Sequence, residues 1–414
     1  MLRKKETGVD TQDAEAREPS VGPAVRPATA PRGAAGRDLR IDFFRGLALL
    51  MVFLIHTHSS LLGWFTTVNL GFSDPAEAFV FLSGYTAGLV YGGVLRRAGW
   101  LAAARRSLRQ AARIYGGHLA VSAVVLALAA FAWRVIGDDA LVREMHLDQF
   151  LQAPGPVVLS ALRLQFRPAN LDVLPLFVVL FLALPAVLAL LTWAPAALVA
   201  ASGSLYLAAQ LWGLNLPGYG GPGWFFNPFA WQSLFCLGVW WGRGHRPGLL
   251  PTLRGPLTLA AGLLLAWSAL VTLRWHFPGL PDVVPSWLGA RLYPISKTAL
   301  APVRLLHFLA LAYLLGLRWP LPHRLVRAWA ARPVLWCGQH SLAIYGWGVL
   351  LSAGAEVALH RMHAVWATLG IGVVGLLAQG GVALMLTRRS GTARPGGDRH
   401  AAPSPREPRR RLAA

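Results

Sequence analysis

Long apolar runs, separated by short stretches rich in charged residues, Gly and Pro, make up most of this chain. Ten of the runs have nearly or fully the length that an α-helix needs to cross about 30 Å of hydrocarbon. The pattern therefore predicts an all-α fold, a polytopic transmembrane helical bundle with about ten spans. We expect the spans near residues 42–62, 76–95, 114–134, 171–192, 195–213, 228–243, 256–275, 300–317, 334–353 and 364–387.

The two ends of the chain lack these runs. Residues 1–40 are charged and rich in Ala and Pro, and residues 388–414 are basic. Segments of this composition cannot bury enough apolar surface to fold, so we predict a disordered tail at each end. The first segment also lacks the apolar stretch of a secretory signal, so we expect no cleavable leader. Residues 41–387 form the predicted membrane domain.

The composition supports a membrane setting. The mean hydropathy is +0.47, 55% of residues are hydrophobic and 14% are charged, against about 25% charged residues in soluble domains. The two cysteines, Cys236 and Cys337, lie alone in apolar stretches and match neither a disulfide framework nor a zinc site. We expect no metal.

The net charge of +21 raises the question of a nucleic-acid partner. Most Lys and Arg residues, however, fall in the two tails and in the segments 96–113, 243–254 and 318–332, each beside an apolar run. Basic residues concentrate on the cytoplasmic side of membrane proteins. The distribution therefore predicts both termini in the cytoplasm and no nucleic-acid partner.

Arg45 and His56 are ionisable residues inside the first apolar run. Eleven positions correspond to three helical turns plus about 20°, so both side chains are predicted on one face, about 16 Å apart along the axis. Ionisable groups within a membrane span are costly and mark functional sites. The structural alternative is an Arg at the membrane interface and a His satisfied in the core.

Several polar motifs follow one another in a fixed order. They include Arg40-Ile-Asp-Phe-Phe-Arg-Gly-Leu-Ala-Leu-Leu50, Asn69-Leu-Gly-Phe-Ser-Asp-Pro-Ala-Glu-Ala-Phe-Val-Phe-Leu-Ser-Gly-Tyr85, Arg167-Pro-Ala-Asn-Leu-Asp-Val-Leu-Pro175, Asn227-Pro-Phe-Ala-Trp-Gln232, Ser296-Lys-Thr298, Arg304-Leu-Leu-His-Phe308 and Cys337-Gly-Gln-His-Ser-Leu342. From Arg37 to Thr387 the chain resembles the OpgC family, bacterial inner-membrane proteins associated with succinylation of osmoregulated periplasmic glucans. The Arg45–His56 spacing and Phe-Leu-Ser-Gly-Tyr are also similar to the wider acyltransferase-3 superfamily.

The resemblance implies transfer of an acyl group from cytoplasmic acyl-CoA to a hydroxyl across the membrane. Succinyl-CoA is then the expected donor, a periplasmic glucan or another glycan the acceptor, and the lipid bilayer and glucan-synthesis machinery the expected partners. No cofactor is expected to be bound permanently. The family's essential Arg and His fall on Arg45 and His56. Family members often have Asp before this His, where this chain has Ile55, and His58 follows on nearly the opposite helix face.

Acyl transfer to a sugar hydroxyl needs a base whose pKa lies near the working pH, which histidine provides. We assign this role to His56, and a covalent acyl-histidine intermediate is the second route. Arg45 could pair with a CoA phosphate or with the carboxylate of the donor.

Arg106, Arg109 and Arg113 have the spacing of one helix stripe. We predict that they hold the phosphorylated end of CoA, and the alternative is anchoring to anionic lipid. Asp74 and Glu77, at the start of the second run, could orient His56 or bind sugar hydroxyls. The structural alternative for these two acids is the capping of a helix start.

Further polar residues lie near the ends of later runs and could line one cavity: Asn170, Asp172, Asn227, Gln232, Lys297, Arg304, His307, Gln339 and His340. A multi-pass transporter or exporter of a glycan or small anionic solute is the main alternative function. Transporters often show matching broken helices in two halves, and no internal repeat is visible here.

Overall fold

The computed structural model describes residues 38–57, 61–137, 143, 147–168, 170–221, 223–245, 250–359 and 364–390. The chain divides into two compact units, Met1–Asp38 and Leu39–Ala414, and the fold below is that of the second. Most of both predicted tails, residues 1–37 and 391–414, lies outside the described residues, and so does His58.

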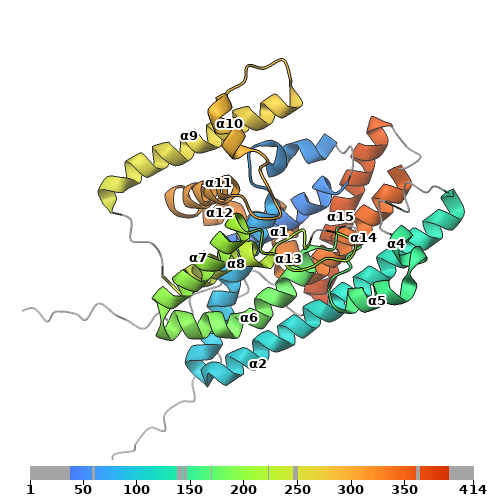
Figure 1. The fold of residues 1–414 in the computed structure, drawn as a ribbon, viewed down its shortest axis with the longest axis horizontal. Helices are drawn as coiled ribbons and strands as arrows, with labels where there is room; N and C mark the ends of the chain where they lie inside the picture. Colours follow the sequence, from blue (N-terminus) through green and yellow to red (C-terminus); the bar gives the residue numbers. More distant parts are fainter. Residues whose placement is uncertain are drawn as a thin grey trace, which may run out of the picture. The chain divides into compact units, whose positions relative to one another are not determined.

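The described residues are mostly helical, which confirms the all-α prediction, and their only β pairing is one isolated bridge between Gly218 and Gly221. The α-helices are α1 (Leu39–Ile55), α2 (Pro75–Ile136), α4 (Leu147–Gln152), α5 (Pro154–Leu162), α6 (Val173–Trp193), α7 (Pro195–Leu211), α8 (Pro228–Gly242), α9 (Pro251–His276), α10 (Ser286–Leu292), α11 (Pro302–Tyr313), α12 (His323–Val326), α13 (Arg332–Gln339), α14 (Ser341–Leu359) and α15 (Val365–Arg389) (Figure 1).

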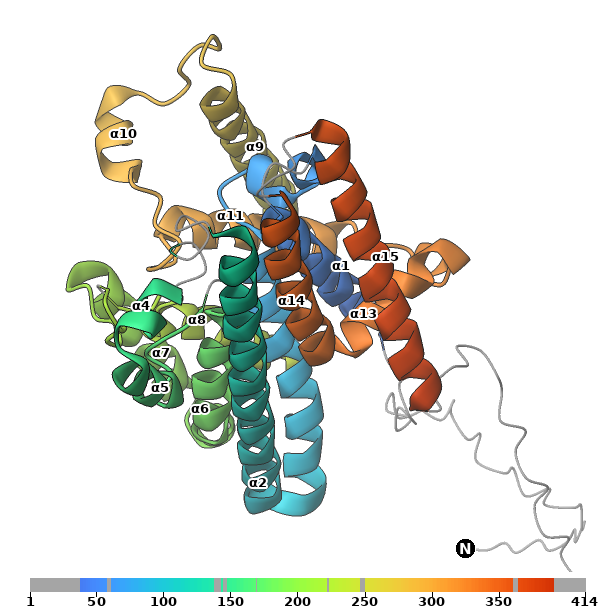
Figure 2. The same ribbon diagram turned by 90° about the vertical axis from the view of Figure 1, so that its right-hand side faces the viewer.

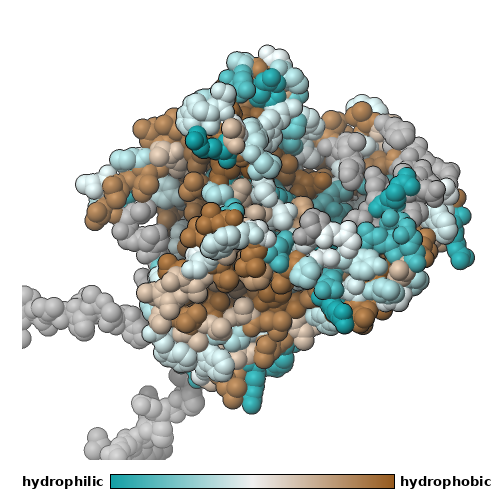
Figure 3. Space-filling model, in the orientation of Figure 1, coloured by the Kyte–Doolittle hydropathy of each residue, from teal (hydrophilic) through white to brown (hydrophobic). Residues whose placement is uncertain are grey.

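Five of the described helices, α2, α6, α9, α14 and α15, are long and apolar enough to cross a membrane. Large apolar side chains also face outward, such as Leu377 on α15 and Leu259 on α9. Figure 3 shows broad hydrophobic areas over α6, α7 and α8. Apolar surface on this scale marks a membrane-facing protein. The count of ten spans and the side on which the termini lie stay predictions.

Helix α2 is a hairpin of two long limbs, which Figure 2 shows lying side by side. The limbs meet at Gly99, whose φ of 76° interrupts the helix and suits a residue without a side chain. The sequence predicted two spans, 76–95 and 114–134, joined by a basic segment over 96–113 that carries a helical arginine stripe. The structure shows helix on both sides of Gly99, and the turn is confined to that residue.

The first predicted span is shorter than expected, because α1 ends at Ile55 and not at residue 62. Beyond it the backbone N–H of His56 bonds to Phe53 three residues back, the tightened geometry of a helix end. Residues Leu61–Phe65 form a separate 3₁₀ turn.

The ninth predicted span, 334–353, is divided at His340 into α13 and α14. A Cβ added at Gly338 would lie 1.8 Å from the carbonyl oxygen of Asp42. Only glycine permits this contact, which holds α13 directly against α1. The break accompanies this packing against α1, which the local sequence does not reveal. Of α13 and α14, only α14 is long enough to span a membrane.

Candidate active site

The start of α2 is fixed by a capping box. Asp74 lies before Pro75, and its Oδ1 accepts a hydrogen bond of 2.8 Å from the backbone N–H of Ala76. Glu77 Oε2 accepts a bond of 2.9 Å from the backbone N–H of Asp74. Each carboxylate thus satisfies a backbone donor that the helix leaves unpaired.

The remaining carboxylate oxygens face two basic residues that are more than 200 positions away in the sequence. Asp74 Oδ2 lies 2.6 Å from Lys297 Nζ and 3.0 Å from Arg304 Nη2. Glu77 Oε1 lies 2.8 Å from Arg304 Nε and 2.7 Å from Arg304 Nη2. We call these four residues the carboxylate cluster. Lys297, with 23% of its side chain exposed, is the most accessible member, whereas Glu77 is fully buried.

Two physical effects compete on Asp74. Burial alone would raise the pKa of this carboxyl, but the nearby charges of Lys297 and Arg304 outweigh it and lower the pKa to about 2. Asp74 is therefore a carboxylate at any physiological pH. Among the described residues neither Asp74 nor Glu77 contacts His56, so the structure does not support the prediction that they orient it.

His307 lies beside the carboxylate cluster on α11 and bonds to Ser73. Its Nδ1 lies 3.3 Å from the backbone N–H of Ser73 and 2.7 Å from the Ser73 hydroxyl. A backbone N–H can only donate, so Nδ1 is the acceptor and the neutral ring carries its proton on Nε2. That nitrogen is buried against Gly71.

His56 has the opposite arrangement. Its Nδ1 lies 2.8 Å from the carbonyl oxygen of Val52, one turn back on α1. A carbonyl oxygen can only accept, so Nδ1 carries the proton and Nε2 of the neutral ring is the acceptor nitrogen. The chain thus holds two histidines in opposite tautomers: the basic nitrogen is Nε2 in His56 and Nδ1, which bonds to Ser73, in His307.

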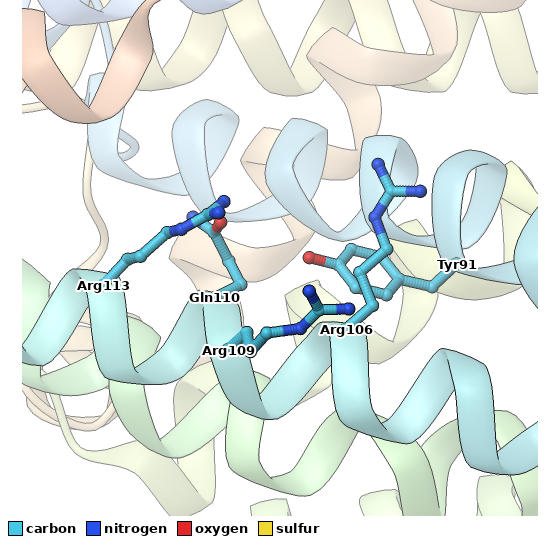
Figure 4. A pocket seen from close by; sticks show the side chains of 5 residues that line it. All are labelled: Tyr91, Arg106, Arg109, Gln110 and Arg113. Carbon is cyan, nitrogen blue, oxygen red and sulfur yellow. The ribbon is translucent and has the colours of Figure 1, made fainter.

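The predicted arginine stripe lines a cavity of about 370 Å³. Arg106, Arg109, Arg113 and Gln110 extend from the second limb of α2 toward Tyr91 on the first limb (Figure 4). Arg106 lies 5.8 Å from the centre of the Tyr91 ring. None of the three guanidinium groups pairs with a carboxylate among the described residues. We call this space the arginine cavity.

A second cavity of about 220 Å³ adjoins the first, with which it shares Tyr91 and Gln110. Along α2 its lining runs from Phe79 to Tyr91, an axial distance of about 18 Å. Arg45 lines this central cavity and donates a hydrogen bond to the Ser341 hydroxyl at the start of α14.

The rest of the central cavity lining is mostly apolar, with few polar groups: Phe79, Ser83, Thr86, Ala87, Val90, Ile114, Leu174, Phe177, Phe181, Leu342 and Tyr345. A third cavity, of about 620 Å³, is lined by Gln339 and His340 and shares Gln110 and Ser341 with the central one. The arginine cavity therefore adjoins a central cavity whose lining, apart from Arg45, is mostly apolar.

Several of the other predicted polar residues have local partners, and that they share one cavity stays a prediction. Asp172 lies 2.8 Å from Arg167, and Asn227 caps α8 by accepting from the backbone N–H of Phe229. Gln232 bonds to Ser202. Each is satisfied locally, as buried polar groups generally are.

Sequence reasoning did not find the pairing of Lys297 and Arg304 with the two acids. A signal for it exists. Both cations precede or open an apolar run without an acidic neighbour in sequence, and charges buried in a membrane protein require a partner. Asp74 and Glu77, at the start of another apolar run, are such partners.

A protein-family model described as OpgC protein matches residues 37–391. The chain belongs to the OpgC family. The matched range contains every helix from α1 to α15 and therefore both the arginine cavity and the carboxylate cluster. Nothing among the curated proteins or the solved structures matches this OpgC chain. The link to the wider acyltransferase-3 superfamily stays a prediction.

Proposed function

We propose that this OpgC-family chain is a membrane-embedded O-acyltransferase. It moves an acyl group, with succinyl as the expected one, from cytoplasmic acyl-CoA to a hydroxyl of a periplasmic glucan or related glycan. The observation that carries the proposal is that the arginine cavity adjoins the mostly apolar central cavity that Arg45 lines, since the two share Tyr91 and Gln110. Such a path suits a donor with a polyanionic end and a slender reactive arm.

The proposed setting is the bacterial inner membrane, with ten spans and both termini in the cytoplasm. In this orientation the turn at Gly99 and the arginine cavity lie on the cytoplasmic side, as the positive-inside rule expects. The start of α2, with Asp74, lies toward the periplasm. Donor and acceptor would then approach from opposite ends of the first limb of α2.

The arginine cavity is the proposed site for the phosphates of CoA. Guanidinium groups bind phosphate through paired, charge-assisted hydrogen bonds. Arg106, Arg109 and Arg113 are exposed and have no carboxylate partner among the described residues, so their charge is available to a ligand. The acyl arm would extend along the central cavity past Arg45, whose guanidinium can pair with the free carboxylate of a succinyl group.

In the proposed reaction the acceptor hydroxyl oxygen attacks the thioester carbonyl carbon. A C–O bond forms and the C–S bond breaks, so CoA leaves as a thiolate. His56 Nε2 takes the hydroxyl proton and returns it to the leaving sulfur, which balances the charge. The hydrogen bond from Nδ1 to Val52 supports this role because it leaves Nε2 as the acceptor. Attack by His56 itself, to form an acyl-histidine, is the alternative route.

The experiment is succinyl transfer by the purified protein in lipid nanodiscs, with succinyl-CoA labelled in the acyl group and a glucan added. Transfer of label to the glucan and release of free CoA thiol are measured together. We expect both in the parent protein and neither with His56→Ala. His323→Ala is the matched control, since His323 is an exposed histidine on α12, far in sequence from the segment that carries Arg45 and His56.

The outcomes separate the proposed functions. Transfer from acetyl-CoA but not from succinyl-CoA would keep the mechanism and change the donor. Full transfer by His56→Ala would overturn the assignment of the base. No turnover of any acyl-CoA by a folded protein would overturn the acyltransferase and favour a transporter or exporter.

A further inference from the structure

An exposed aromatic ring lies beside the most accessible charge of the carboxylate cluster. Phe225 precedes α8 in a non-helical segment and is 44% exposed. Lys297 Nζ lies 5.7 Å from the centre of this ring and 5.3 Å from that of Phe226, which is buried and meets Phe225 edge-on. Because Phe225 is exposed in a glycine-rich loop, packing of the protein core does not explain why its ring lies beside Lys297.

The Lys297 ammonium has more N–H donors than it has acceptors among the described residues. Among the described residues its only acceptor is Asp74 Oδ2, at 2.6 Å, and an ammonium carries three N–H donors. The Asp74 carboxylate lies beside this ammonium, and its Oδ2 can accept a further hydrogen bond. A neutral ligand that both donates and accepts hydrogen bonds therefore fits this place better than an anion does.

The backbone that carries Lys297 is held in one conformation. Trp231 donates its indole N–H to the Lys297 carbonyl at 3.0 Å. Leu300, three residues on, has a φ of 48°, which is strained for a residue other than glycine, and its carbonyl accepts from Tyr206 at 2.9 Å. Strained backbone persists where the surroundings hold it, and it gathers at ligand sites.

The Phe225 loop is tied to the same segment. Asn227, two residues after Phe225, caps α8 with its side chain and donates its backbone N–H to the Thr298 carbonyl at 3.2 Å. The ring and the ammonium thus come from chain segments about 70 residues apart but form one rigid surface.

We propose that Phe225, Lys297 and Asp74 form a subsite for one sugar of the glycan acceptor. The apolar face of the sugar ring packs on Phe225, and its hydroxyl groups accept from Lys297 and donate to Asp74. The inference rests on the proposed function, since it supplies the acceptor side of that reaction. It also gives Asp74 the second of its predicted roles, the binding of sugar hydroxyls.

The test is direct binding of a fluorescently labelled glucose oligosaccharide to the purified protein in nanodiscs, without any donor. Phe225→Ala and Lys297→Met are each expected to weaken binding about tenfold, the loss expected for one good contact. Phe225→Trp is expected to restore binding. Phe65→Ala is the matched control, because Phe65, at the end of the 3₁₀ turn Leu61–Phe65, is also exposed but has no charged residue over its ring among the described residues.

Phe225→Ala keeps the test decisive if Lys297→Met fails to fold, since it leaves the carboxylate cluster intact. Parent-like binding by Phe225→Ala, or an equal loss with Phe65→Ala, would overturn the subsite. Absence of oligosaccharide binding by the parent would overturn it as well. If the proposed function is wrong, the transfer assay instead shows no turnover of acyl-CoA.

Discussion

Charged residues at the two ends of the first limb of α2 are arranged in opposite ways. At the start of the limb, Asp74 and Glu77 are buried and matched by Lys297 and Arg304. Near the Gly99 turn, Arg106, Arg109 and Arg113 are exposed, lack carboxylate partners among the described residues and line a cavity. A matched charge cluster fixes structure, whereas an unmatched one is available to a ligand.

The two groups of charged residues should therefore contribute differently, one to stability and the other to ligand binding. Removing one partner of a buried pair leaves an uncompensated charge and costs stability. Removing one exposed arginine leaves nothing uncompensated, and its loss should appear only when an anionic ligand binds. Stability measurements should therefore respond at the carboxylate cluster and donor affinity at the arginine cavity.

The largest effect is expected from Arg304→Met, which leaves Glu77 buried without its cation. Loss of one partner of a buried ion pair typically costs about 3–5 kcal/mol of unfolding free energy. Chemical unfolding of the detergent-solubilised protein measures it. The double variant Glu77→Leu with Arg304→Met should recover much of the loss, because it removes both charges. A simple sum of the two single losses would contradict this account of the cluster.

A smaller effect should follow from acidification, through Asp74. Its pKa in the folded protein, about 2, lies below the usual 3.8. A lowered pKa contributes stability that is present above 3.8 and is lost as the pH falls toward 2, about 2 kcal/mol in all. Unfolding followed between pH 6 and pH 2 should show this decline. The Asp74→Asn variant should lack this pH-dependent loss of stability, whereas Arg113→Gln should still show it.

At the other end, Arg113→Gln should raise the KM for succinyl-CoA about tenfold, the effect of losing about 1.4 kcal/mol of charge-assisted binding. The unfolding free energy should stay within about 0.5 kcal/mol of the parent value, as for other surface substitutions. Arg389→Gln, at the exposed end of α15, is the control. Equal changes in KM for both variants would mean that general surface charge attracts the donor.

The smallest effect is expected from Ser341→Ala, which removes a hydrogen bond that Arg45 makes in the central cavity. One such bond contributes about 1 kcal/mol, so kcat/KM for succinyl-CoA should fall about fivefold. Ser352→Ala on the same helix is the control, because its hydroxyl bonds only to Val349 in the described structure. Unchanged kinetics with Ser341→Ala would show that Arg45 is placed by other contacts.

The sequence predicted the features that depend on periodicity along one segment. The all-α fold and the shared face of Arg106, Arg109 and Arg113 follow from helical spacing, and the structure shows both. The motifs also placed the chain in its family. The transfer chemistry and the roles of Arg45 and His56 stay predictions.

The sequence did not predict the features that depend on contacts between distant segments. The pairing of Glu77 with Arg304 joins residues 227 positions apart. The break at His340 accompanies the close contact of Gly338 with α1, and the tautomers of His56 and His307 depend on which backbone group each ring meets. Local pattern can indicate that a buried charge needs a partner, but it does not say which distant residue or backbone group supplies it.

The central claim, transfer of an acyl group across the membrane, is tested most directly in sealed vesicles of known orientation. Labelled succinyl-CoA, which does not cross the bilayer, is supplied on one side and the glucan on the other. The account predicts labelled glucan only when succinyl-CoA is on the cytoplasmic face, and none with His56→Ala. Passage of unmodified glucan across the membrane without any turnover of succinyl-CoA would contradict it.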